Sequence, residues 1–112
     1  MKNLSVEEKA LWLAIEDYSG LWEVFWEMDP ELTQTQKREI AEQAVRSLLA
    51  RGWIALYRCY GVSEEEQPLP LAEYEGALSD PANWNTPTAG SVQVLIGATE
   101  EGKRAYREGK LI

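Results

Sequence analysis

The sequence contains no histidine and only one cysteine, Cys59. Without histidine, neither a Ser/His/Asp triad nor a Cys/His nucleophile pair can be built, and a histidine-containing zinc site is excluded. A single cysteine excludes an internal disulfide and a four-cysteine zinc site. The acidic run Glu64–Glu66 offers carboxylates for acid/base chemistry or a divalent cation, but three adjacent acids are more typical of a solvated cluster, because metal ligands must converge on one point. The sequence therefore predicts a protein that is not an enzyme and that uses neither a cofactor nor a metal.

Long apolar runs are also absent. No stretch approaches the ~18 consecutive apolar residues that a bilayer-spanning helix needs, and the start MKNLSVEEK has no apolar core of a signal peptide. We therefore expect a cytoplasmic protein without a membrane partner. With 112 residues, 45% hydrophobic content and five tryptophans, the chain is long enough to form one domain over residues 1–112 around a real core.

Basic residues are missing altogether from residues 59–102, which carry eight acidic ones. The net charge of the chain is −8, and residues 1–32 contribute a balance of −6 to it. Residues 33–58 and residues 103–112 each have a balance of +3. Positive charge is therefore confined to two segments, and any anionic partner would have to meet one of them.

The chain is organised around residues 33–60, where an amphipathic helix is followed by a strand across Gly52. Thr33 and Gln36 fit a capping box at the helix start, and Gly52 stands where a left-handed residue would end the helix. Beyond Gly52, aromatic and β-branched residues over Trp53–Tyr60 are typical of a strand. The apolar residues of the helix recur every three or four positions and therefore share one face: Ile40, Ala41, Ala44, Val45, Leu48 and Leu49.

Two shorter helices are expected before this unit. Ser5 is placed to cap the first helix, and Ser19-Gly20 ends it. Leu21–Met28 follows as a short second helix, although eight residues with three aromatics also fit a strand.

After the central unit, residues 61–91 form a long connection with a short helix expected over Leu71–Leu78. Val92–Ala98 predicts a second strand, antiparallel to the first. Thr99 is placed to cap a last helix over Glu100–Glu108, and Gly109 to end it. A connection of this length inside one domain is expected to have structure or a role of its own.

This order of elements is that of a winged-helix domain, and two motifs strengthen the likeness. Leu49-Ala50-Arg51-Gly52-Trp53-Ile54 leads from helix to strand, and Thr99-Glu100-Glu101-Gly102 follows the second strand. Both resemble the MarR type of transcription regulator, over residues 33–60 and 92–107. The resemblance implies an α+β winged helix with three N-terminal helices, a two-stranded antiparallel wing whose loop is elaborated at residues 61–91, and a short C-terminal helix.

In the DNA-binding members of this superfamily, the helix before the wing enters the major groove. The resemblance therefore makes polar and basic residues of the central helix candidate DNA contacts. The chain departs from the family pattern in its wing, where carboxylates stand in place of Lys and Arg and would be repelled by phosphate. The candidate DNA contacts are Gln34, Thr35, Lys37, Arg38 and Arg46.

The same basic residues have a plainer interpretation. Arg38 and Arg46 each lie four positions from Glu42, the spacing of helical ion pairs, which favours an ordinary solvated helix face. Winged helices also serve as protein-binding modules. The sequence thus favours a non-enzymatic regulatory or protein-interaction module. The alternative is a dimeric DNA-binding transcription regulator, in which pairing through the N-terminal helices doubles the basic surface.

Tryptophans supply the candidate partner surface. Trp12 and Trp26 fall off the predicted apolar faces, and exposed tryptophans of this kind mark a surface for a partner protein or a second copy of the chain. Burial in the core is the more general expectation for tryptophan. Trp84 is the third candidate, either anchoring its loop to the domain or stacking on a ligand.

Overall fold

The computed structural model describes residues 6–28, 30–59, 66–85 and 92–109, leaving out the side chains of Trp26 and Glu27. Within these residues it contains four α-helices and a four-stranded antiparallel sheet, which confirms the predicted α+β class. The predicted helix cap Ser5 and the acids Glu64 and Glu65 lie outside the described residues. The elements in chain order are α1 (Val6–Glu16), β1 (Ser19–Gly20), η1 (Leu21–Glu27), α2 (Gln34–Ala50), β2 (Ile54–Cys59), β3 (Gln67–Pro68), η2 (Leu71–Glu73), α3 (Tyr74–Ser79), η3 (Pro81–Trp84), β4 (Gln93–Ala98) and α4 (Glu100–Arg107).

The sheet has the strand order β1-β4-β2-β3, and its centre is the predicted ribbon. β2 pairs antiparallel with β4 from Ile54 opposite Ala98 to Cys59 opposite Gln93, as expected. Two further strands were not predicted: β1, which pairs with β4, and β3, which pairs with β2. Each added strand has two residues, and so short a strand leaves no alternating pattern in the sequence.

The central helix has the predicted boundaries. Thr33 Oγ1 accepts a hydrogen bond from the backbone N–H of Gln36 at 3.1 Å, and Gln36 Oε1 accepts one from the N–H of Thr33 at 2.9 Å. Gly52 has a φ of +73°, the left-handed conformation that glycine adopts without strain. The predicted apolar face packs inward, with four residues buried and two partly buried: Ala41, Ala44, Val45, Leu48, and then Ile40 and Leu49.

Residues 21–27 form the predicted short helix, η1, which is of the 3₁₀ type. With three residues per turn, Leu21 and Val24 lie one above the other and are both fully buried. Trp22 and Phe25, on the other sides of this helix, are only partly buried. The chain reaches η1 directly from β1, so its start is set by the sheet.

The two motifs that carry the family resemblance contact each other. The hydroxyl of Thr99 donates a hydrogen bond to the carbonyl oxygen of Gly52 at 2.7 Å and accepts one from the N–H of Gly102 at 3.0 Å. The first turn of α4 thereby packs against the start of β2, where a Cβ on Gly102 would overlap the carbonyl of Trp53. The predicted cap at Thr99 and the stop at Gly109, with a φ of +68°, are confirmed.

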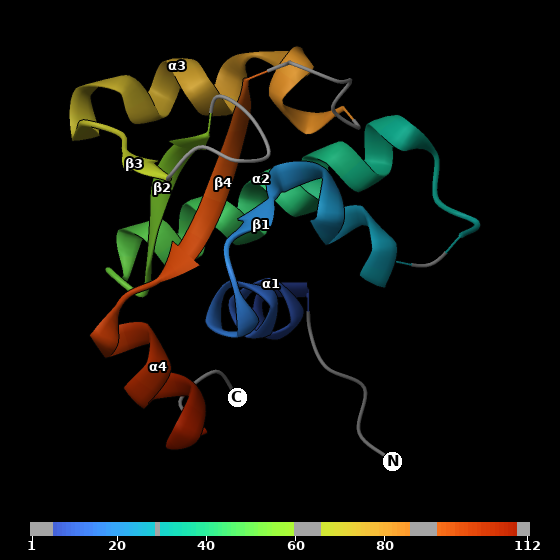
Figure 1. Cartoon of the computed structure of the whole chain (residues 1–112). Coiled ribbons are helices and arrows are strands. Elements are labelled where there is room, and N and C mark those ends of the chain that lie inside the picture. The colour runs from blue at the N-terminus through green and yellow to red at the C-terminus, as the bar shows by residue number, and fades with distance from the viewer. Residues whose placement is uncertain (1–5, 29, 60–65, 86–91, 110–112) are drawn as a thin grey trace.

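Helices α1 and α2 cover one face of the β2–β4 ribbon (Figure 1). Helix α3 lies across the end of the ribbon where β2 finishes, and α4 lies beside the end where β4 finishes. The core between them contains fully buried side chains from every layer, among them Leu11, Val45, Leu48, Leu56 and Ile96. No helix in the described part of the chain combines the length and the apolar character needed to cross a bilayer.

Candidate functional site

Two of the predicted DNA contacts, Arg38 and Arg46, take part in a charged network that joins α2 to α3. Arg46 binds Glu75 through two hydrogen bonds of 2.6 and 3.1 Å, and its Nε donates to Glu42 at 2.9 Å. Arg38 donates to Glu42 at 3.3 Å and to the carbonyl oxygen of Leu78 at 3.1 Å. We call Arg38, Glu42, Arg46 and Glu75 the α2–α3 network.

The α2–α3 network shifts the pKa values of Arg46 and Glu75. The hydrogen bonds that Arg46 donates to Glu75 and, with a smaller effect, to Glu42 raise the pKa of Arg46 above its ordinary value. Hydrogen bonding to Arg46, together with the charge of that guanidinium, lowers the pKa of the Glu75 carboxyl. Both changes favour the charged forms, so the pair is ionised at neutral pH.

The predicted i, i+4 pairs of Arg38 and Arg46 with Glu42 are confirmed. The partnership of Arg46 with Glu75 was missed, because 29 residues separate them and no local spacing signals it. Arg58 likewise pairs with Glu73 at 3.3 Å. Two carboxylates that were expected to repel DNA from the wing therefore neutralise arginines of this same domain.

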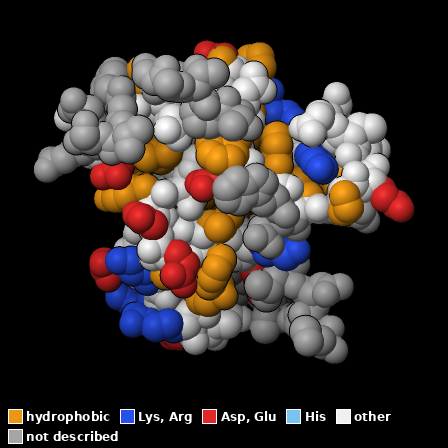
Figure 2. Space-filling view, turned by 45° about the vertical axis from the view of Figure 1, so that its right-hand side comes forward, with side chains coloured by type: hydrophobic (Ala, Val, Ile, Leu, Met, Phe, Trp, Pro, Cys, Tyr) orange, Lys and Arg blue, Asp and Glu red, His pale blue; other side chains and the backbone are white. Residues whose placement is uncertain are grey.

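None of the most exposed residues of α2 is basic, although the Arg46 side chain is 36% exposed within the network. Gln34 and Thr35 are exposed as predicted, whereas Lys37 is partly buried beside η1. Among the described residues, Lys37 forms no ion pair. The exposed positions from the first turn to the middle of the helix are Gln34, Thr35, Gln36, Glu39 and Gln43. Figure 2 shows that Lys and Arg side chains on the face drawn there form small separate groups and not one continuous patch.

Trp84 does not belong to an exposed partner surface, because its side chain is only 1% exposed. Its Nε1 donates to the carbonyl oxygen of Leu78 at 2.9 Å, its ring stacks on Phe25 with centroids 6.3 Å apart, and the Arg38 guanidinium lies 5.2 Å from its centroid. These contacts support the loop-anchor interpretation, and a role of Trp84 in binding a partner stays a prediction, because its ring also lines the groove described next. Trp12, on α1, is 41% exposed, and the side chain of Trp26 lies outside the described residues.

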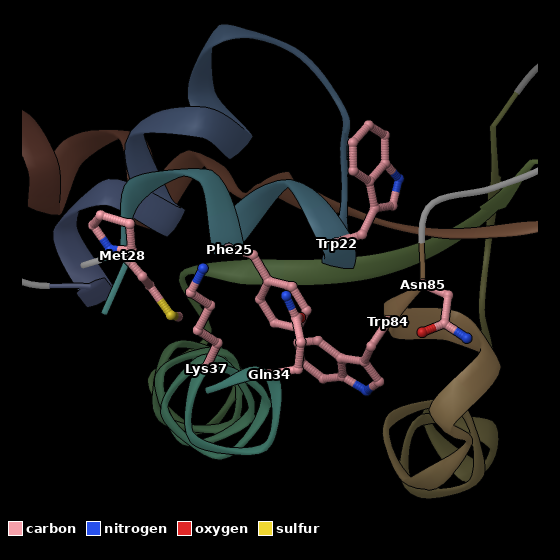
Figure 3. Close-up of a pocket in the computed structure, with 8 residues that line it drawn as sticks. Trp22, Phe25, Met28, Gln34, Lys37, Trp84 and Asn85 are labelled. Carbon is pink, nitrogen blue, oxygen red and sulfur yellow. The ribbon is translucent and has the colours of Figure 1, made fainter. Parts of the chain in front are cut away.

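A groove of about 500 Å³ opens between η1, the first turn of α2, and η3 (Figure 3). Among the described residues, its lining is aromatic and apolar, with two amides, one ammonium group and no acidic side chain. Thr35, Arg38 and Pro81 line a smaller hollow of about 290 Å³ next to it, together with some of the same residues. We call the cavity of about 500 Å³ the η1–α2 groove; its lining residues are Trp22, Phe25, Met28, Pro30, Gln34, Lys37, Trp84 and Asn85.

The groove brings together residues that sequence reasoning had assigned to different roles. Gln34 and Lys37 were candidate DNA contacts, and Trp84 was a candidate for a partner surface. Met28 and Asn85 were not singled out, because η3 is far along the chain from η1 and α2 and no local pattern connects them. A larger hollow of about 630 Å³ beside α3 contains Arg58 and Glu73, which are already paired with each other.

Neither a metal centre nor a relative identifies the site. Within the described ranges, no three acidic or cysteine side chains lie close enough together to hold a metal ion. Comparisons with protein-family models, with curated proteins and with solved structures find no match to this chain. The geometry of the groove and of the α2–α3 network therefore carries the functional argument.

Proposed function

We propose that this chain is a non-enzymatic winged-helix module that acts in regulation by binding another protein. The winged-helix assignment is supported by the passage from α2 through Gly52 into an antiparallel ribbon of β2 and β4. It is supported further by the hydrogen bond between Thr99 and Gly52, which joins the two motifs that resemble the MarR type.

The observation that carries the proposal is the α2–α3 network. Affinity for duplex DNA comes largely from Lys and Arg side chains that neutralise phosphates and release counterions. Here Arg38 and Arg46 already neutralise Glu42 and Glu75, and α3 lies along the side of α2 that bears them. The side of α2 left to solvent is polar and carries the acidic Glu39. A helix of this kind is poorly suited to a DNA groove and well suited to a protein surface.

Two surfaces are available for a protein partner. One is the η1–α2 groove, with its aromatic floor. The other contains Trp12 on α1 and Tyr18 just beyond it, each 41% exposed. Exposed tryptophan and tyrosine are enriched where proteins bind each other, because they provide a large contact area at a small entropic cost.

Titration of a labelled random duplex of about 30 base pairs at low salt, followed by fluorescence anisotropy, tests the proposal. We expect no binding that depends on salt, because the network leaves α2 without free arginines. An oligolysine peptide on the same duplex is the positive control. Clear binding of the protein that weakens steeply as salt is added would contradict the proposal.

The second candidate is a dimeric DNA-binding transcription regulator. Gln34 and Thr35 favour it, because they are exposed at the start of α2, where a recognition helix contacts bases. This candidate requires a dimer in solution, with two copies of α2 about one turn of DNA apart. Mass measurement by light scattering, combined with the DNA titration, separates it from a monomeric protein-binding module.

A further inference from the structure

We propose that the η1–α2 groove binds an acidic segment of a partner protein, in which a bulky apolar side chain lies next to an Asp or Glu. This inference rests on the proposed protein-binding function and gives that function a site and a class of partner. It follows from the shape of the groove, from the charge of its lining, and from the way other cations of the domain are already paired.

The floor of the groove is made for an apolar side chain. Phe25 and Trp84 stack with an interplanar angle of 14°, and Met28 lies beside them, where its thioether adapts to the shape of an inserted group. Trp22 and Pro30 complete the wall. The volume of about 500 Å³ falls in the range of roughly 300–1,000 Å³ typical of clefts that enclose ligands.

The charge of the lining selects an anionic neighbour for that side chain. The whole chain has a net charge of −8, yet none of the eight described residues that line the groove is acidic. Figure 3 shows Lys37 projecting from α2 between Met28 and Phe25, with Gln34 beside Phe25 and Asn85 on the far side of Trp84. The ammonium group and the two amides offer hydrogen-bond donors to a carboxylate.

The start of α2 adds to this preference. Its 17 residues direct the positive end of a long helix dipole toward the groove. Thr33 caps only the N–H of Gln36, and the first N–H groups of a helix have no acceptor within the helix. The helix dipole contributes less to the attraction of a carboxylate than the charge of Lys37 does.

Lys37 differs from the other cations near this site. Arg38 and Arg46 are held by Glu42 and Glu75, whereas Lys37 has no carboxylate partner among the described residues. Nucleic acid and membrane surfaces are also anionic, but both present a broad negative field that a chain of charge −8 repels. A peptide that places one carboxylate beside one apolar side chain matches the groove without meeting that repulsion.

Selection from a phage-displayed library of random 12-residue peptides against the full chain, followed by anisotropy measurements on the recovered peptides, tests the inference. We expect the peptides to share a Trp, Phe or Leu next to an Asp or Glu. Lys37→Glu should weaken their binding about tenfold or more, because it removes one charge-assisted contact and adds repulsion. Lys103→Glu makes the same change on α4, away from the groove, and should leave binding unchanged.

A second pair of variants tests for a gain of affinity. Gln34→Lys adds a cation at the edge of the groove and should tighten binding several-fold, whereas Gln43→Lys adds one farther along α2 and should have little effect. Thermal unfolding of each variant checks that the fold is intact. These four positions are exposed or partly buried, so the substitutions do not disturb the core.

The inference is overturned if no peptide is recovered, if the peptides lack a carboxylate, or if Lys37→Glu binds them as well as the original chain does. Peptides that ignore Lys37 but are lost in Trp12→Ala would move the binding surface to α1 and leave the proposed protein-binding function standing. Self-association abolished by Lys37→Glu would identify a second copy as the occupant and contradict the proposed partner. Salt-sensitive binding of random duplex DNA would instead remove the proposed function itself.

Discussion

Trp84 is the residue on which the attachment of the 66–85 region to α2 depends most. Its buried ring contacts Phe25 from η1 and Arg38 from α2, and its indole N–H bonds to Leu78. We expect Trp84→Ala to lower the free energy of unfolding by about 3–5 kcal/mol, because it leaves a large cavity and removes that hydrogen bond. Chemical denaturation of both chains measures the difference.

Trp84→Phe separates the two contributions. Phenylalanine keeps most of the apolar volume, and the Leu78 carbonyl retains a donor in Arg38, so we expect a loss of only about 1–3 kcal/mol. Trp12→Ala is the matched control at an exposed tryptophan and should have a much smaller effect. Equal losses for Trp12→Ala and Trp84→Ala would show that Trp84 is not an anchor.

The Glu75 carboxylate makes the stability of the fold depend on pH. Its pKa is lowered in the folded chain, from an ordinary value of 4.5, by the hydrogen bond and charge of Arg46. Its stabilising contribution is therefore present above the unfolded pKa and is lost as the pH falls through the lower folded pKa. We expect the unfolding midpoint of the original chain to exceed that of Glu75→Gln at pH 7, and the two to converge as the pH falls below the folded pKa of Glu75.

The size of this difference should be small, because Glu75 is exposed and surface ion pairs are screened by water and salt. Glu39→Gln removes the same charge from the solvent face of α2 and serves as the control. A difference between Glu75→Gln and the original chain that stays constant across the pH range would show that the charge of Glu75 does not act through Arg46.

At the scale of elements, the surroundings of two glycines lead us to expect opposite effects on stability when each is replaced by alanine. Gly102 lies in the first turn of α4 against the carbonyl of Trp53, so Gly102→Ala should lower the free energy of unfolding by about 1–3 kcal/mol or more. Gly76 lies in α3 with open space around its Cα, so Gly76→Ala should stabilise by about 0.5–1 kcal/mol through its higher helix propensity. Thermal and denaturant unfolding measure both.

Gly76→Ala also acts as the control for Gly102→Ala, since both replace a helical glycine by alanine. If Gly102→Ala were neutral, α4 would not pack on β2 as closely as the hydrogen bond between Thr99 and Gly52 requires. A loss of stability in Gly76→Ala would contradict the helical conformation and the open surroundings of that residue.

Elements with local signals could be predicted from the sequence, and elements defined by tertiary contacts could not. The capping box of Thr33 and Gln36, the left-handed Gly52 and the cap at Thr99 are local patterns, so α2, β2 and α4 were foreseen. β1 has two residues and exists only because β4 passes beside it. The seven residues of η1 are too few for their spacing to distinguish a 3₁₀ helix from an α-helix.

At the scale of the whole molecule, the fold redistributes charge in a way that composition alone does not reveal. The sequence separates a positive segment, residues 33–58, from an acidic one, residues 59–102. The fold brings these two segments together, so that Glu75 and Glu73 meet Arg46 and Arg58. From the sequence we expected the acidic residues after Cys59 to disfavour DNA by repulsion, and these ion pairs were not part of that prediction.

The candidate site, like the elements of the fold, could be predicted from the sequence only where a local signal exists. Gln34, Lys37 and Trp84 each stood out in the sequence as a polar, basic or aromatic residue at a notable position. Their convergence with Met28 and Asn85 depends on the path of η1 and on the docking of η3, which no spacing along the chain encodes. Sequence reasoning therefore found part of the lining and none of the groove.

The most direct test of the central claim, that the arginines of α2 are held by α3 and so do not serve DNA, is a site-resolved titration. Two-dimensional ¹H–¹⁵N spectra of the labelled chain would be recorded with increasing random duplex DNA at low salt. The network predicts that the backbone signals of residues 34–46 and the Nε–H signal of Arg46 stay in place. Shifts of these signals that reverse on adding salt would contradict it.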